Sequence, residues 1–105
     1  MDFEFYHHNY TGATKRFGVV VQNGNSSAVT LTIHNKAIGT SGSSAADELA
    51  MTAPMVRSYF NSSASTVTIP AKSSRFVLYA DVANKLLVNG KLSMTSNKGN
   101  VYARI

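Results

Sequence analysis

The chain contains three histidines and no cysteine, so imidazole nitrogen is the ligand most available to a transition metal. His7 and His8 are adjacent, and neighbouring residues of an extended strand point to opposite faces, so this pair is not expected to chelate one ion. Either of them could meet His34 if their strands pair. We expect ordinary polar or half-buried histidines, with no bound metal and no cofactor.

Nucleophilic catalysis needs a hydroxyl or a thiol held beside a base. Serine and threonine are abundant, but no serine lies in the Gly-x-Ser-x-Gly elbow that exposes a catalytic nucleophile. The carboxylates do not suggest an acid–base pair, because Asp47 and Glu48 suit the first turn of a helix and Asp81 follows a predicted strand. The sequence therefore predicts a protein that is not an enzyme, and a small hydrolase or metal-binding protein is the third hypothesis.

Polar aromatic residues recur along the first predicted strand, over residues 2–10. Tyr6, His8 and Tyr10 alternate with other residues and so share one face of that strand. Their rings offer flat apolar surface with a polar group, which suits stacking on sugars. Two basic residues, Lys15 and Arg16, follow closely. We predict these five residues as a candidate ligand-binding set, the alternative being a solvated edge strand.

The charge balance also bears on the ligand. Ten Lys and Arg oppose five Asp and Glu, for a formal net charge of +5, which favours anionic partners. The basic residues are spread singly apart from Lys15 and Arg16, so the sequence defines no local basic patch. Nucleic acid is the disfavoured ligand, because no ribonucleoprotein-type aromatic motif accompanies the tyrosines.

The length of 105 residues suits one domain, residues 1–105, built around one core. No apolar stretch approaches the roughly 20 residues of a membrane-spanning helix, and the polar start at residues 1–4 does not resemble a signal peptide. The protein is therefore either cytosolic or an excised part of a longer secreted chain.

The elements that position these residues are mainly strands. Alternation and turn residues predict about eight of them, over residues 2–10, 17–21, 29–34, 66–69, 75–80, 85–88, 91–95 and 101–105. The pattern is clearest at Val29, Leu31 and Ile33, which should be buried, whereas His34 should face water.

Two Asn-Gly dipeptides, at residues 23–24 and 89–90, are expected to form hairpin turns between successive strands. The short link between 66–69 and 75–80 suggests that these two strands are neighbours. Within the second of them, Phe76, Leu78 and Ala80 are expected on one face.

One helix is predicted over residues 44–60. Ser44 is its expected N-cap, with Asp47 three residues later, and Pro54 is expected to kink the helix or to begin a second one. Its apolar face is predicted from Leu49, Ala53, Val56 and Phe60. The fold class that follows is a mainly β, antiparallel β-sandwich, immunoglobulin-like or jelly-roll-like, with one short helical insertion.

Four segments, residues 5–12, 16–21, 29–33 and 67–74, together resemble a known group of proteins. They are similar to β-sandwich segments of secreted or surface proteins of Gram-positive bacteria, often in chains that also carry a copper-amine-oxidase-like stalk domain. The resemblance implies an extracellular or cell-surface, non-enzymatic accessory module of a bacterial protein. It carries over no catalytic and no copper-binding residue.

The function that the sequence favours is a non-catalytic extracellular accessory or interaction module, which binds a protein partner or a polymer and whose specific role the sequence does not define. The alternative is a module that binds carbohydrate or an anionic cell-wall polymer through Tyr6, His8, Tyr10 and the dispersed basic residues. The salt dependence of binding distinguishes these two functions, because binding through charge weakens as the salt concentration rises and binding through apolar surface does not.

Overall fold

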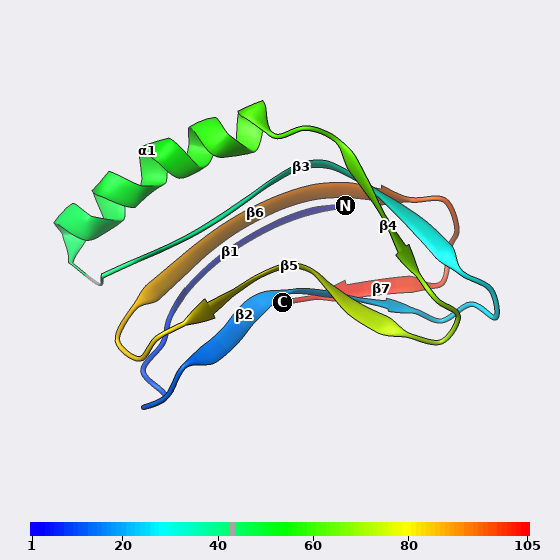
Figure 1. Ribbon diagram of the computed structural model, residues 1–105, viewed down its shortest axis with the longest axis horizontal. Coiled ribbons are helices and arrows are strands. Elements are labelled where there is room, and N and C mark those ends of the chain that lie inside the picture. The colour runs from blue at the N-terminus through cyan, green and yellow to red at the C-terminus, as the bar shows by residue number, and fades with distance from the viewer. Residues whose placement is uncertain (43) are drawn as a thin grey trace.

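The structure, a computed structural model, describes the backbone of residues 1–42 and 44–105. It describes their side chains except those of residues 45, 46, 48, 49 and 53. The elements follow the order β1 (Asp2–His8), β2 (Lys15–Asn23), β3 (Val29–Ser41), α1 (Ala45–Asn61), β4 (Ser65–Ile69), β5 (Ser74–Val82), β6 (Leu87–Ser96) and β7 (Val101–Arg104) (Figure 1).

The strands form two sheets. One has four strands in the order β1-β6-β3-β4, and the other has three in the order β5-β2-β7. Every pairing is antiparallel, and α1 lies along β3 on the outside of the four-stranded sheet (Figure 1). The predicted fold class, a mainly β antiparallel sandwich with one helix, is confirmed.

The core lies between the two sheets. Val29, Leu31 and Ile33 of β3 are fully buried, as predicted, and they pack with buried Val19 and Val21 of the facing sheet. Because successive side chains of a strand alternate, the residues between them face outward. His34 is exposed, as expected, at an irregularity of register that separates Ile33 from Asn35.

The predicted hairpin at residues 23–24 is wrong. β2 pairs with β5 and β7, whereas β3 pairs with β4 and β6, so the link between β2 and β3 crosses from one sheet to the other. Asn23 is fully buried, and its amide nitrogen donates to the carbonyl oxygens of Ser27 at 2.9 Å and Ile69 at 3.1 Å. These hydrogen bonds therefore fix the loop that crosses from one sheet to the other.

The predicted hairpin at residues 89–90 is also wrong, because both residues lie inside the continuous strand β6. Gly90 pairs with Phe5 of β1 on one side and with Ile38 of β3 on the other. A Cβ atom at this position would stand 2.3 Å from Cζ of Phe5. Glycine is needed here for close packing against an aromatic ring, and a turn does not form.

The strands at 66–69 and 75–80 are not paired neighbours. β4 is the edge of the four-stranded sheet and β5 is an edge of the three-stranded sheet. The link between them crosses the sandwich, and the amide of Asn23 also donates to the carbonyl oxygen of Pro70 at 3.1 Å. Lys72 in this link adopts a φ of 54°, which turns the chain tightly enough for the crossing.

The helix begins as predicted, because the Ser44 hydroxyl accepts a hydrogen bond of 3.1 Å from the backbone N–H of Asp47. Pro54 does not divide it, since α1 runs without interruption from Ala45 to Asn61. Pro54 and Ala50 are both exposed, so water can bond the carbonyl group that the proline ring leaves without a donor.

The predicted apolar face of the helix is wrong where the structure describes it. Val56 and Phe60 are 40% and 68% exposed, whereas Met55 and Tyr59 are buried against Ala37 of β3. The buried stripe therefore lies one residue away from the predicted one. The predictions for the side chains of Glu48, Leu49 and Ala53 lie outside the described residues.

Among the described residues, no helix combines the length and the hydropathy that crossing a membrane requires.

Candidate functional site

The structure brings Tyr6, His8 and Tyr10 together along the edge strand β1 and just after it. The Tyr6 hydroxyl and Nε2 of His8 are 3.1 Å apart, and their ring centroids are 5.3 Å apart. The His8 and Tyr10 rings stack at 5.7 Å with an angle of 5° between their planes. We call these three residues the β1 stripe, a continuous row of exposed rings.

The two basic residues of the predicted set lie elsewhere. Lys15 and Arg16 belong to β2, in the other sheet. Phe5 and Phe17 point into the sandwich, so their neighbours Tyr6 and Arg16 point outward on opposite sides of the molecule. The five predicted residues therefore do not form one site.

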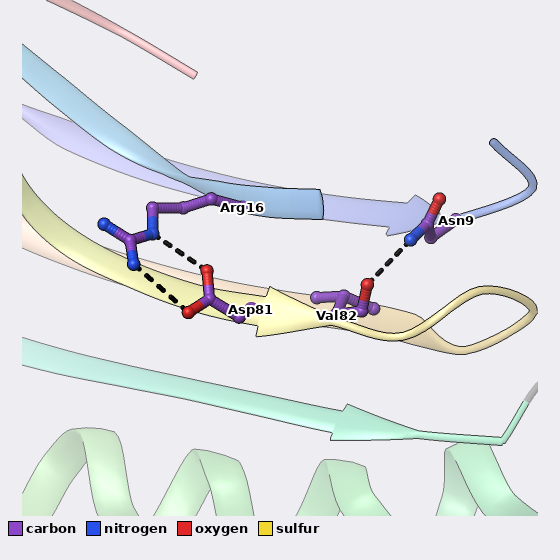
Figure 2. A network of polar contacts seen from close by, with 4 residues as sticks. All are labelled: Asn9, Arg16, Asp81 and Val82. Carbon is purple, nitrogen blue, oxygen red and sulfur yellow. Dashed lines mark hydrogen bonds and ion pairs between the residues drawn. The ribbon is translucent and has the colours of Figure 1, made fainter. Parts of the chain in front are cut away.

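Arg16 is held by a carboxylate on the adjacent strand. Its Nε donates to Oδ1 of Asp81 at 2.8 Å, and its Nη2 donates to Oδ2 at 3.1 Å (Figure 2). These hydrogen bonds hold the pKa of Asp81 below its ordinary value and raise the pKa of Arg16. The guanidinium group also lies over two rings, with Cζ 4.2 Å from the centroid of Tyr79 and 5.7 Å from that of Phe76. Its orientation is thus fixed before any ligand binds.

Phe76 was expected on the same face as Leu78 and Ala80, and this prediction is wrong. Phe76 is 40% exposed, and its ring lies 5.6 Å from the ring of Tyr79, which is also exposed. The two aromatic rings and Arg16 form a platform on the outer face of the three-stranded sheet.

A change of register explains why two residues three apart share a face. Val19 pairs with Leu78 while Val20 pairs with Phe76, so Val77 is an extra residue on β5. Such a bulge reverses the alternation of the strand, and Val77 and Leu78 are in consequence both buried. The sequence carries no signal that locates the bulge, because residues 76–80 are all apolar or aromatic and show no alternation.

Beside the platform lies an open hollow with a volume of about 480 Å³. It forms because β7 pairs with β2 at residues 20–23, and no described strand pairs with residues 15–19 on that side. The side chains that line it include two arginines, Arg16 and Arg104, together with Phe17, Phe76 and Ile105. We call it the β2 hollow.

The outer face continues beyond the hollow along β7. Tyr102 is 63% exposed and pairs with Gln22, which faces outward on β2. The Tyr102 hydroxyl donates to Oδ1 of Asn100 at 2.9 Å, which orients the ring. The outer face of this sheet therefore carries exposed aromatic rings on β5 and β7 and polar side chains on β2 between them.

The histidines do not gather. The His7 ring stacks with Phe17 at 5.9 Å, while His8 lies on the opposite face of β1. β1 pairs with β6 and not with β3, so neither histidine meets His34, whose Nε2 is 3.0 Å from Oγ1 of Thr95. Within the part of the chain that the structure describes, no group of three or more His, Cys, Asp or Glu side chains could hold a metal ion.

Comparisons with protein-family models, with curated proteins and with solved structures find no match for this chain. The functional argument therefore depends on the geometry of the β2 hollow, the platform and the β1 stripe.

Proposed function

We propose that the chain is a non-catalytic binding module for an anionic polysaccharide, and that one acidic sugar of the polymer occupies the β2 hollow. The observation that carries the proposal is the composition of the hollow, in which two guanidinium groups flank exposed apolar and aromatic side chains. Guanidinium groups bind carboxylates with paired hydrogen bonds, and an aromatic ring offers a flat surface to the C–H face of a sugar.

Each arginine has a distinct part in this proposal. Arg16 is oriented by Asp81 and by the Tyr79 ring, so it supports the platform and presents fixed N–H groups at its rim. Arg104 is exposed and has no acidic partner among the described residues, so its charge is available to a carboxylate of the ligand. The net charge of +5 adds a general attraction for a polyanion.

The extracellular or cell-surface setting that the resemblance implies belongs to the same proposal, because acidic polysaccharides are abundant on cell surfaces. The β1 stripe favours a second candidate function, the binding of an uncharged sugar. Its support is the near-parallel stacking of His8 and Tyr10 on an exposed edge, with no lysine or arginine among the three residues.

The proposal is tested by affinity electrophoresis of the purified chain through gels that contain polygalacturonate or neutral dextran. Arg104→Gln is expected to weaken retardation by polygalacturonate by about tenfold, since a hydrogen bond to a charged group contributes about 1.5–3 kcal/mol. Arg57→Gln is the matched control, because Arg57 is also an exposed arginine and lies on the helix outside the other sheet. Phe76→Ala is expected to weaken binding without a change of charge.

Two results would count against an acidic sugar in the hollow. Equal losses in the Arg104 and Arg57 variants would mean that only net charge matters. No retardation by polygalacturonate at low salt would exclude this class of ligand, and retardation by dextran that Tyr10→Ala abolishes would instead support the β1 stripe.

A further inference from the structure

Half of β3 has a free edge. β4 pairs with β3 at residues 29–33, but β3 continues to Ser41, and among the described strands the one that pairs with residues 36–41 is β6, on one side. Instead of a strand, α1 runs back along this half of β3 (Figure 1). A strand edge of this kind presents backbone donors and acceptors that another extended chain can pair with.

The groups that face this edge can be identified. The backbone N–H of Lys36 donates to Oγ of Ser62, in the link from α1 to β4, at 3.0 Å, and so it points away from β6. In an antiparallel strand this direction repeats at every second residue. The N–H and C=O groups of Ile38 and Thr40 therefore face the same free edge, and in the part of the chain that the structure describes no strand pairs with them on that side.

An open groove with a volume of about 540 Å³ lies between α1 and the free edge of β3. Residues 38–42 of the chain form its floor, and Asp47, Met51, Pro54 and Met55 form its wall. A Cβ atom on Gly39 would stand 3.0 Å from Sδ of Met51, so the glycine lets the methionine side chain reach the strand. Methionine is flexible and polarisable, which suits contact with varied apolar side chains.

The two ends of the free edge differ in charge. The Asp47 carboxylate lies close to Gly42 at one end. The exposed Lys36 lies at the other end, two residues along β3 from Ile38, where the lining of the groove stops. A strand that pairs antiparallel with β3 would begin beside Asp47 and end beside Lys36. The added strand would complement Asp47 with a basic residue at its first position and Lys36 with an acidic residue at its last position.

We propose that this groove binds an extended segment of a partner protein as an additional antiparallel strand, with a basic residue at the N-terminal end of the segment and an acidic residue at the C-terminal end. The geometry is that of β-strand addition, in which the backbone supplies most of the hydrogen bonds. The groove lies on the four-stranded sheet, so this inference is independent of the polysaccharide site on the other sheet.

The test is a titration of the ¹⁵N-labelled chain with the acetylated, amidated peptide Lys-Val-Thr-Val-Thr-Glu, followed through backbone amide resonances up to millimolar peptide. The expected result is a set of shifts centred on Ile38 and Thr40. The peptide with Lys and Glu exchanged should bind more weakly. Asp47→Asn should weaken binding of the first peptide by up to about fivefold, the effect of one exposed ion pair, whereas Glu4→Gln on β1 should not.

Thr40→Pro gives a sharper test, because proline removes an N–H that faces the free edge and not one that bonds β6. We expect this variant to keep the dispersed spectrum of the folded chain and to lose peptide binding. If it does not fold, peptides methylated on alternate backbone nitrogens replace it, and one of the two alternations should abolish binding.

Three results would overturn the proposal. The first is no shift at residues 36–41 with millimolar peptide. The second is undiminished binding by Thr40→Pro or by both methylated peptides. The third is a shift at Ile38 and Thr40 that depends on protein concentration without peptide, which would assign the edge to a second copy of this chain.

Discussion

The side-chain amide of Asn9 donates a hydrogen bond of 2.7 Å to the carbonyl oxygen of Val82 (Figure 2). Asn9 follows β1 and Val82 ends β5, so this bond joins the four-stranded sheet to the three-stranded sheet at one end of the sandwich. The same nitrogen donates to the carbonyl oxygen of Ala13 at 2.9 Å, and Oδ1 accepts from the backbone N–H of Thr11 at 3.1 Å. Every polar atom of this fully buried side chain is used.

Asn9→Ala is expected to destabilise the fold by about 1–3 kcal/mol, because it removes the buried hydrogen bond to the Val82 carbonyl oxygen and the part-buried bonds to Ala13 and Thr11. Urea unfolding followed by circular dichroism measures the change. Asn61→Ala is the control, since Asn61 is exposed at the end of α1, and it should cost less than about 0.5 kcal/mol. Equal costs for the two variants would mean that the bond between the sheets adds nothing to stability.

Gly90→Ala is expected to cost about 1–3 kcal/mol, the usual range for overpacking a core. The new methyl group would collide with the Phe5 ring, so Phe5→Leu in the same chain should recover part of the loss. Gly99→Ala is the matched control, because nothing lies within 4 Å of a Cβ atom there. Thermal denaturation compares the variants, and a loss that Phe5→Leu does not reduce would contradict the steric explanation.

Leu31→Ala should cost about 2–5 kcal/mol, because Leu31 is fully buried between the sheets. His34→Ala, three residues later on the same strand, should cost less than about 0.5 kcal/mol, since His34 is exposed. The free energies of unfolding of the two variants, measured in urea, therefore test which side chains of β3 face the core. A severe loss in the histidine variant would mean that its hydrogen bond with Thr95 supports the fold.

The Asp81 carboxyl group should titrate below its ordinary pKa of about 3.9, because the hydrogen bonds from Arg16 are stronger to its ionised form. A depressed folded-state pKa means that the pair favours the fold above the unfolded-state pKa, and that this contribution disappears as the pH falls through the folded-state pKa. Carboxyl ¹³C shifts measured against pH give the value. Arg16→Gln should move the midpoint of Asp81 upward, and an unchanged midpoint would show that the hydrogen bond is not the cause.

Local features of the fold could be predicted from sequence because they depend on local chemistry. The alternation at Val29, Leu31 and Ile33 identifies a half-buried strand, and the spacing of Ser44 and Asp47 identifies a helix cap. The pairing of strands could not be predicted in the same way. The dipeptides at 23–24 and 89–90 are identical, yet the first crosses between sheets and the second packs against Phe5. The partners that decide between these outcomes are far away in the sequence.

The same difference between local features and contacts of distant segments applies to the candidate site. The β1 stripe was predicted because its three residues belong to one alternating segment. The β2 hollow was missed because Arg16, Phe76 and Arg104 come from three strands. The bulge at Val77 also reverses the face on which Phe76 lies, and a bulge depends on how two strands pair.

The burial of Asn9 has a consequence for how the protein is produced. Asn9-Tyr10-Thr11 has the Asn-x-Thr spacing of an acceptor for N-linked glycans, which are attached through the side-chain amide nitrogen. In the folded chain that nitrogen bonds both Ala13 and Val82 and has no access to solvent. A secretory pathway that glycosylates the nascent chain would replace one of these hydrogens with a sugar before the sheets close. A host without that modification preserves the bond, and the folded protein then offers no acceptor at this asparagine.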